Sequence, residues 1–237
     1  MSGTAALSGE AIAGHHGDEK YYLTKSKDEV KYYRRRAEEL LELAHPLMEI
    51  YREDSADTLN AFLLADSRTE GKRRSILSAL PLYTMDREYL EKFLEKRELN
   101  EKEKTAVLSY YDGQRSNIER ILKKDTVEDE ISRISKEEFE KYPILLSLSG
   151  MFCEKEIAYT YEEYLAHLEQ TEQFANTHPN YVLSENSSHA FRNLQIIIHE
   201  GEWAMVSKSK TPVIHFVIKH PKLRSAIESF IPPVVEE

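Results

Sequence analysis

Cysteine is almost absent from the sequence. The chain of 237 residues contains one, Cys153, so no intramolecular disulfide can form. Cys153 has no partner at CxxC spacing, and nothing in the local sequence lowers the pKa of its thiol, so we interpret it as a small core residue. A chain without disulfides is typical of reducing compartments, and we expect a cytoplasmic location.

Glycine is also scarce, and the motifs that depend on it are missing. Eight glycines leave little room for a loop that cradles phosphate, and the sequence holds no P-loop, GxGxxG or GxSxG motif. It also lacks HExxH, because His199-Glu200 is followed by glycine in a predicted turn. We therefore expect a protein that is not an enzyme, with no catalytic residue, no cofactor and no metal.

Histidines near the predicted carboxy-terminal strands are the residues that could contradict this expectation. If they converged, they could hold a metal ion. The simpler interpretation is that two of them end strands and two lie in loops: His189, His199, His215 and His220.

Long apolar runs are missing too, and the charge is unevenly distributed. No stretch approaches the roughly 18–20 apolar residues that cross a bilayer, so we expect no membrane association. The formal charge is −10; residues 26–124 contain 20 basic and 20 acidic side chains, whereas 125–237 contain 10 and 19. A second half this acidic is poorly suited to binding the phosphate backbone of nucleic acids. We therefore expect no direct binding of nucleic acid. The basic run Arg34-Arg35-Arg36 is interpreted as a solvated helix face paired with nearby glutamates.

The first half of the chain shows helical periodicity. Residues 1–25 have no period and are interpreted as a mobile lead-in. Ser26 with Glu29, and Asn100 with Glu103, have the spacing of capping boxes at helix starts. Apolar residues recur at helical spacing and predict helices over 26–51, 58–65, 76–80, 86–97 and 100–124. This pattern favours an N-terminal helical domain, 26–124, built as a helical bundle or as a helical-repeat-like stack.

The second half mixes helices and strands. Residues 125–134 are charged without an apolar face, and we interpret them as the domain boundary. Capping boxes at Ser135 and Thr160 predict two helices, and Pro221 suits the start of a third. Residues 144–152 fit a strand or a buried helical turn equally well. Short strands are predicted over 181–183, 194–199, 203–207 and 213–218. The order predicts an α+β regulatory domain, 125–237, in which a small antiparallel β-meander packs on helices.

Gly201 marks a hairpin turn between two of these strands, because glycine tolerates the positive φ of a tight turn. If the loop is Glu200-Gly201, one face of the hairpin, directed at the final helix, carries Leu194, Ile196, Ile198, Trp203 and Met205. The other face then carries Gln195, Ile197, His199, Glu202, Ala204 and Val206.

The ends of the meander strands hold the candidate ligand-binding residues Arg192, Trp203 and Lys208. An arginine beside a tryptophan suits a flat ligand that carries a carboxylate or a phosphate. Alternatively, Trp203 belongs to the core and Arg192 to the rim.

The carboxy-terminal sequence resembles a known family. Residues 191–233, FRNLQIIIHEGEWAMVSKSKTPVIHFVIKHPKLRSAIESFIPP, together with HPNY at 178–181, are similar to the end of certain bacterial transcriptional regulators, chiefly from Firmicutes. Those regulators carry an amino-terminal helix-turn-helix of the lambda-repressor-like (XRE) class. This chain shows no helix-turn-helix segment. The resemblance therefore implies the regulatory part of such a protein, and no functional residue carries over.

These features predict a non-enzymatic module that senses a ligand or a partner and reports by oligomerisation. The expected partners are a small-molecule effector, another protein, or further copies of the chain. The alternative is a helical protein–protein interaction adaptor whose 26–124 bundle binds a helix or peptide. An enzyme with an unrecognised site is the third hypothesis.

Overall fold

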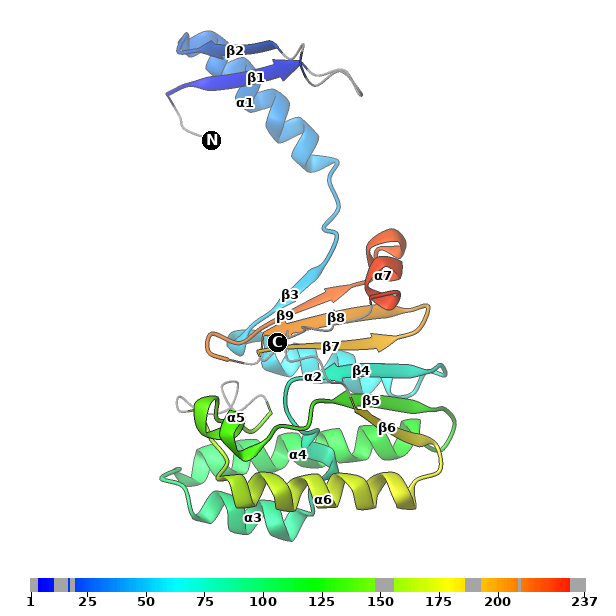
Figure 1. Cartoon of the computed structure of the whole chain (residues 1–237). Helices are drawn as coiled ribbons and strands as arrows, with labels where there is room; N and C mark the ends of the chain where they lie inside the picture. The colour runs from blue at the N-terminus through cyan, green and yellow to red at the C-terminus, as the bar shows by residue number, and fades with distance from the viewer. Residues whose placement is uncertain are drawn as a thin grey trace. The chain divides into compact units, whose positions relative to one another are not determined.

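The computed structural model describes residues 4–10, 17, 20–147, 156–185, 193–208 and 210–230. The chain forms two compact units, Met1–Pro46 and Leu47–Glu237, hereafter the N-terminal and C-terminal units (Figure 1). This division differs from the sequence-based one into 26–124 and 125–237. No helix in the described ranges is long and apolar enough to cross a membrane.

The N-terminal unit consists of a hairpin and one helix. Strands β1 (Ala6–Glu10) and β2 (Lys20–Thr24) pair antiparallel, inside the segment that we expected to be a lead-in, and α1 (Lys27–Glu42) follows. Helix α1 starts where predicted, but the Ser26 side chain makes no capping bond. The Glu29 carboxylate instead accepts hydrogen bonds from the hydroxyl groups of Thr24 and Tyr22, which ties the start of the helix to β2.

The C-terminal unit is built on a mixed sheet of seven strands in the order β3-β9-β8-β7-β4-β5-β6. Strands β4, β5 and β6 run parallel, and the other pairs are antiparallel (Figure 1). The strands are β3 (Glu49–Tyr51), β4 (Arg73–Leu77), β5 (Val127–Ile131), β6 (Tyr181–Glu185), β7 (Leu194–His199), β8 (Trp203–Lys208) and β9 (Ile214–Ile218).

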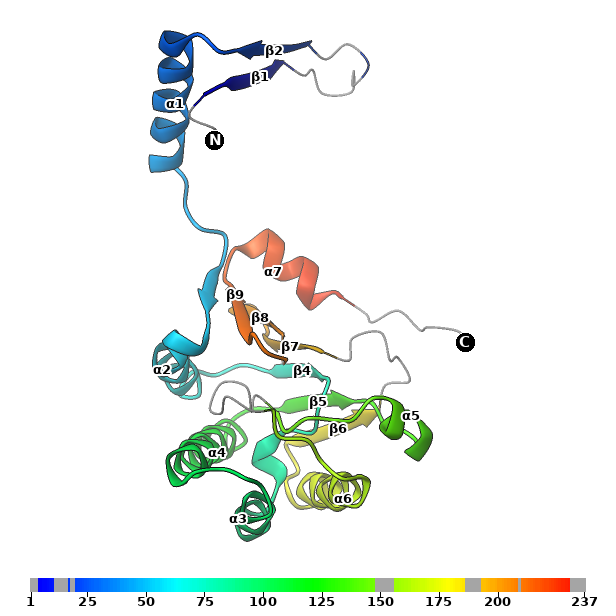
Figure 2. The same cartoon turned by 90° about the vertical axis from the view of Figure 1, so that its left-hand side faces the viewer.

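Helices cover the two faces of this sheet unequally. Parallel neighbours need crossover connections, and these place α3 (Arg87–Glu95), α4 (Glu101–Ile121) and α6 (Tyr161–Thr177) on one face. Helix α2 (Ala56–Asp66) lies on the same face, whereas α7 (Pro221–Glu228) lies on the opposite face (Figure 2). The remaining helical segments are η1 (Glu53–Ser55), η2 (Leu82–Thr84) and α5 (Lys136–Lys141).

Three helix starts follow from local sequence as predicted. At α4, α5 and α6 the N-cap side chain accepts the backbone N–H three residues on, and the glutamate there accepts the N-cap N–H in return. The pairs are Asn100 with Glu103, Ser135 with Glu138, and Thr160 with Glu163.

The prediction of an N-terminal helical bundle followed by a small separate β-meander is wrong. The chain begins with strands, and the meander β7-β8-β9 is part of the seven-stranded mixed sheet. Strand β4 occupies the segment predicted as a helical turn, and β5 occupies the predicted domain boundary. Strand β5 was missed because its charges alternate with its buried residues. Val127, Asp129 and Ile131 are buried under the helices, and the two glutamates between them are half-buried on the other face.

The predicted division of the β7–β8 hairpin into faces is also wrong for β8. His199 pairs with Trp203, so the loop has three residues, Glu200-Gly201-Glu202, with Gly201 at φ +82°. Because side chains alternate along a strand, one extra loop residue exchanges the faces of β8. Trp203 and Met205 therefore share the face of Gln195, Ile197 and His199, under α2 and not under α7.

The core of the C-terminal unit includes a polar cluster centred on a buried histidine. His167 of α6 is fully buried, with Nδ1 2.9 Å from the Tyr159 hydroxyl and Nε2 3.2 Å from the Thr84 hydroxyl. The Thr84 hydroxyl also lies 2.7 Å from that of Thr171. Burial lowers the pKa of His167 to about 3, so the ring is neutral in the folded protein at neutral pH.

This cluster predicts acid destabilisation. Below pH 6.5 the unfolded chain protonates His167 and the folded chain does not, so the free energy of unfolding should fall by about 1.4 kcal/mol per pH unit down to about pH 3. His167→Asn should remove this part of the slope, and His45→Asn, at an exposed position, should not. Urea unfolding at about pH 7 and about pH 5 measures both slopes. An unchanged slope in His167→Asn would contradict the assignment.

Candidate ligand-binding site

A cavity of about 120 Å³ lies between the helix-covered face of the sheet and helices α2 and α4. Alternate residues of five strands, β4, β5, β7, β8 and β9, form the sheet wall, because alternation directs every second side chain to the same face. They include Ser75, Leu77, Gln195, Ile197, Met205 and His215. The helix wall includes Leu59 and Leu63 of α2 and Gln114, Asn117 and Ile118 of α4. A concave, mainly apolar pocket with a few polar groups is the usual form of a small-molecule site.

Asp66, the last residue of α2, is the acidic residue of the lining and pairs with the arginine that lines the same cavity. Its Oδ2 accepts hydrogen bonds from Nε and Nη2 of Arg73, at 3.1 Å each. The guanidinium also donates to the backbone carbonyls of Asp66 and Gly71, at 2.8 and 2.7 Å. The side chains of Asp66 and Arg73 are 9% and 5% exposed, so this ion pair is largely shielded from water.

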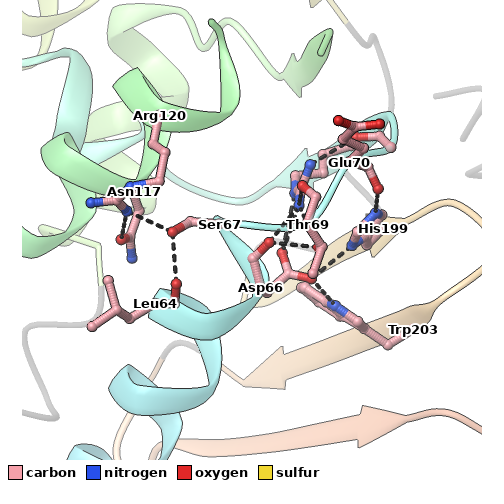
Figure 3. A network of polar contacts seen from close by, with 11 residues as sticks. Leu64, Asp66, Ser67, Thr69, Glu70, Asn117, Arg120, His199 and Trp203 are labelled. Atoms are coloured by element: carbon pink, nitrogen blue, oxygen red, sulfur yellow. Dashed lines mark hydrogen bonds and ion pairs between the residues drawn. The ribbon is translucent and has the colours of Figure 1, made fainter. Parts of the chain in front are cut away.

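The other carboxylate oxygen of Asp66 joins the pair to the sheet (Figure 3). Trp203 Nε1 donates to Oδ1 at 2.7 Å, and His199 Nδ1 lies 2.7 Å from the same atom. His199 Nε2 lies 3.0 Å from the Glu70 carbonyl oxygen. Four nitrogen atoms from three side chains thus converge on one carboxylate, so both of its oxygens already have partners within the protein.

His215 of β9 contributes a neutral wall. Its Nδ1 lies 2.8 Å from the Ser207 hydroxyl, and both side chains are fully buried. Burial lowers the pKa of His215 to about 4. The ring is therefore uncharged at neutral pH.

Two glutamine side chains line the cavity without hydrogen-bond partners. Gln195 of β7 is 3% exposed, and Gln114 of α4 is half-buried. Neither side chain hydrogen-bonds to any described residue. A buried amide without a partner, such as that of Gln195, is unfavourable and is usually satisfied by water or by a ligand, whereas the half-buried Gln114 can also reach solvent.

A buried acid lies behind the lining. Asp129 of β5 is fully buried, and its Oδ2 accepts hydrogen bonds from the hydroxyl groups of Tyr83 and Tyr181. Its Oδ1 has no hydrogen-bond partner among the described residues. Burial raises the pKa of Asp129, and the hydroxyl groups of Tyr83, Tyr181 and Ser75 partly oppose this effect. Tyr83 lines the cavity, so it connects this acid to the site.

The structure separates two of the three predicted ligand residues, Trp203 and Lys208. Arg192 lies outside the described residues. Trp203 and Lys208 are the first and last residues of β8, and Lys208 Nζ donates to the Thr211 carbonyl at 3.4 Å. Trp203 does line the cavity, but its N–H is taken by Asp66. Sequence reasoning missed Gln195 and Asp66, although each is a polar residue at the edge of an apolar run.

Metal binding finds no support in the described part of the chain. It contains no group of three or more His, Cys, Asp or Glu side chains arranged to hold an ion. His199 and His215 belong to the separate contacts described above, and His220 is the N-cap of α7. His189 and Cys153 lie outside the described residues.

The N-terminal unit exposes an apolar surface, defined here as Leu7, Tyr21, Leu23, Leu40, Leu41 and Leu43. Each of these side chains is at least 59% exposed. Of the described residues in this unit only Thr24 and Val30 are buried. A unit this small with so little burial is a poor candidate for independent stability.

No protein-family model, curated protein or solved structure matches this chain. Function is therefore inferred from the geometry of the described residues.

The loop that carries the Asp66 network predicts a large effect of a single methyl group. Gly71 has φ +134°, and a Cβ there would lie 2.4 Å from His199 Nε2. Gly71→Ala should therefore lower the free energy of unfolding by about 2–4 kcal/mol. Gly113→Ala, in α4 with no atom within 4 Å of its Cβ, should raise it by up to about 1 kcal/mol. Urea unfolding tests the pair, and equal values for the two variants would contradict the prediction.

Proposed function

We propose that this chain is a non-enzymatic regulatory module that binds a small molecule in the cavity of its C-terminal unit. The observation that carries this proposal is the preformed apolar cavity with two unpaired amides and an internally neutralised ion pair. The resemblance of residues 191–233 to bacterial transcriptional regulators supports placing the module in a regulator of that class.

The walls of the cavity suit a sensor because they come from distant parts of the chain. Helix α2, helix α4 and five strands each contribute side chains. A ligand that contacts all of them stabilises their mutual arrangement, and binding to the native state alone raises its stability. The signal is then a change in the population of one arrangement of the unit.

One contact in the site resembles the nucleophile–base pair of a hydrolase, namely Ser207 with His215. The Ser207 side chain is fully buried and is not part of the cavity lining, so a ligand in the cavity does not contact its hydroxyl. A base whose pKa is lowered to about 4 is also a poor proton acceptor near neutral pH. These facts support a structural hydrogen bond and a module without catalytic activity.

Ligand binding predicts a thermal shift that depends on the cavity. A ligand at about 100 times its Kd adds about 2.7 kcal/mol, which raises Tm by about 5–10 °C in a unit of this size. A library of metabolites, screened by differential scanning fluorimetry on the full chain, should contain such a compound. Ile197→Phe, which fills the cavity, should abolish the shift.

Ile144→Phe is the matched control, because Ile144 is half-buried against a different core cluster. It should preserve the shift. If no compound raises Tm, or if Ile197→Phe responds like the wild type, the cavity is not a ligand site.

The apolar surface of the N-terminal unit favours a second role, self-association. Helix α1 has a basic run followed by Glu38, Glu39 and Glu42, and Arg34 and Arg36 make no ion pair with any described residue. An antiparallel second copy of α1, overlapping along the length of the helix, places glutamates opposite these arginines and covers the leucines at the end of each helix with the first turns of its partner. We propose that the chain forms a homodimer through this surface.

The homodimer predicts a molar mass twice the 27.6 kDa of one chain. Leu40→Glu combined with Leu41→Glu should return the mass to that of one chain, because charge prevents burial of the leucines. Leu165→Glu, at a 43% exposed position of α6, should leave the dimer intact. Size-exclusion chromatography with light scattering measures all three. A monomeric wild type, or a dimer that survives the double substitution, contradicts the assignment.

A further inference from the structure

The volume of the cavity matches that of a small ring. Its volume of about 120 Å³ is close to that of an engineered cavity of about 150 Å³ that binds benzene. A six-membered ring with one small substituent is therefore the size class that fits without movement of the walls.

The charges in the lining exclude an ionic ligand. Asp66 and Arg73 are the charged side chains of the described lining, and they bond to each other and to Trp203, His199 and backbone carbonyls. An anion or a cation entering the cavity would lose its hydration and gain no opposite charge.

The two unpaired glutamines specify the polar part of the ligand. Gln195 faces the cavity from the sheet and Gln114 from α4. Each amide offers both a donor and an acceptor. A ligand group that satisfies them must also donate and accept while remaining neutral, and carboxamides and lactams have this property.

We infer that the cavity binds an uncharged molecule the size of a substituted ring, which carries a carboxamide or lactam group that pairs with Gln195 and Gln114. This inference rests on the proposed sensing function and adds the chemical class of its ligand. Ordered water on the two amides is the competing explanation of their unpaired state.

Three probes of nearly equal shape separate these possibilities. Benzamide is neutral, benzoate is an anion and benzamidine is a cation. Isothermal titration calorimetry and differential scanning fluorimetry on the full chain at neutral pH should show binding and a raised Tm with benzamide, and neither with the two ions.

Substitutions test which side chains hydrogen-bond to the carboxamide group of benzamide. Gln195→Leu and Gln114→Leu should each weaken benzamide binding by about tenfold and leave the binding of toluene unchanged or tighter. Gln173→Leu, at an exposed position of α6, is the matched control and should bind benzamide like the wild type.

The outcomes distinguish this inference from the function on which it rests. Tighter binding of benzoate or benzamidine than of benzamide, or benzamide binding that is unaffected by both glutamine substitutions, overturns the ligand class. If the metabolite library contains a ligand but benzamide does not bind, the sensing function stands and the ligand class falls. If no compound of either kind binds, the amides hold water only and both proposals fall.

Discussion

The carboxylate of Asp66 is the contact on which the candidate site depends. It ends α2, and through Arg73, His199 and Trp203 it fastens that helix to β4, β7 and β8. Buried ion pairs are not strong stabilisers in themselves, but removing one partner leaves an uncompensated charge and typically costs about 3–5 kcal/mol. The network therefore fixes where α2 lies against the sheet, and with it one wall of the cavity.

The same network determines which chemistry the cavity can recognise. Because the acid and the arginine satisfy each other, the lining presents an apolar surface interrupted by amides and a neutral histidine. An arginine beside a tryptophan suits a flat anionic ligand, whereas the charges in the described lining of this cavity are paired with each other. Trp203 contributes its ring to the cavity wall, and its N–H already donates to Asp66.

The two units differ in what stabilises them. The C-terminal unit contains three clusters of buried apolar side chains, which lie along the helix-covered face of its sheet. The N-terminal unit buries Val30 and Thr24 and exposes leucines on both its hairpin and its helix. The larger unit can therefore hold a stable site by itself, whereas the smaller one is suited to contact with another polypeptide. The proposed sensing and the proposed self-association thus fall on separate parts of one chain.

The sequence by itself determined the starts of α4, α5 and α6, because a capping box is complete within four residues. It also located the turn at Gly201, where a positive φ is needed. It could not determine β4 and β5, because their burial comes from partners far along the chain: Ser75 lies beside both Asp129 and Ile197. The sequence VEDEI of β5 has the composition of a charged linker, and its alternate residues are buried only because the neighbouring strands and helices cover them. Only the tertiary structure forms the cavity, because the residues that line it come from parts of the chain more than a hundred positions apart. No local sequence pattern predicts which of these residues come into contact.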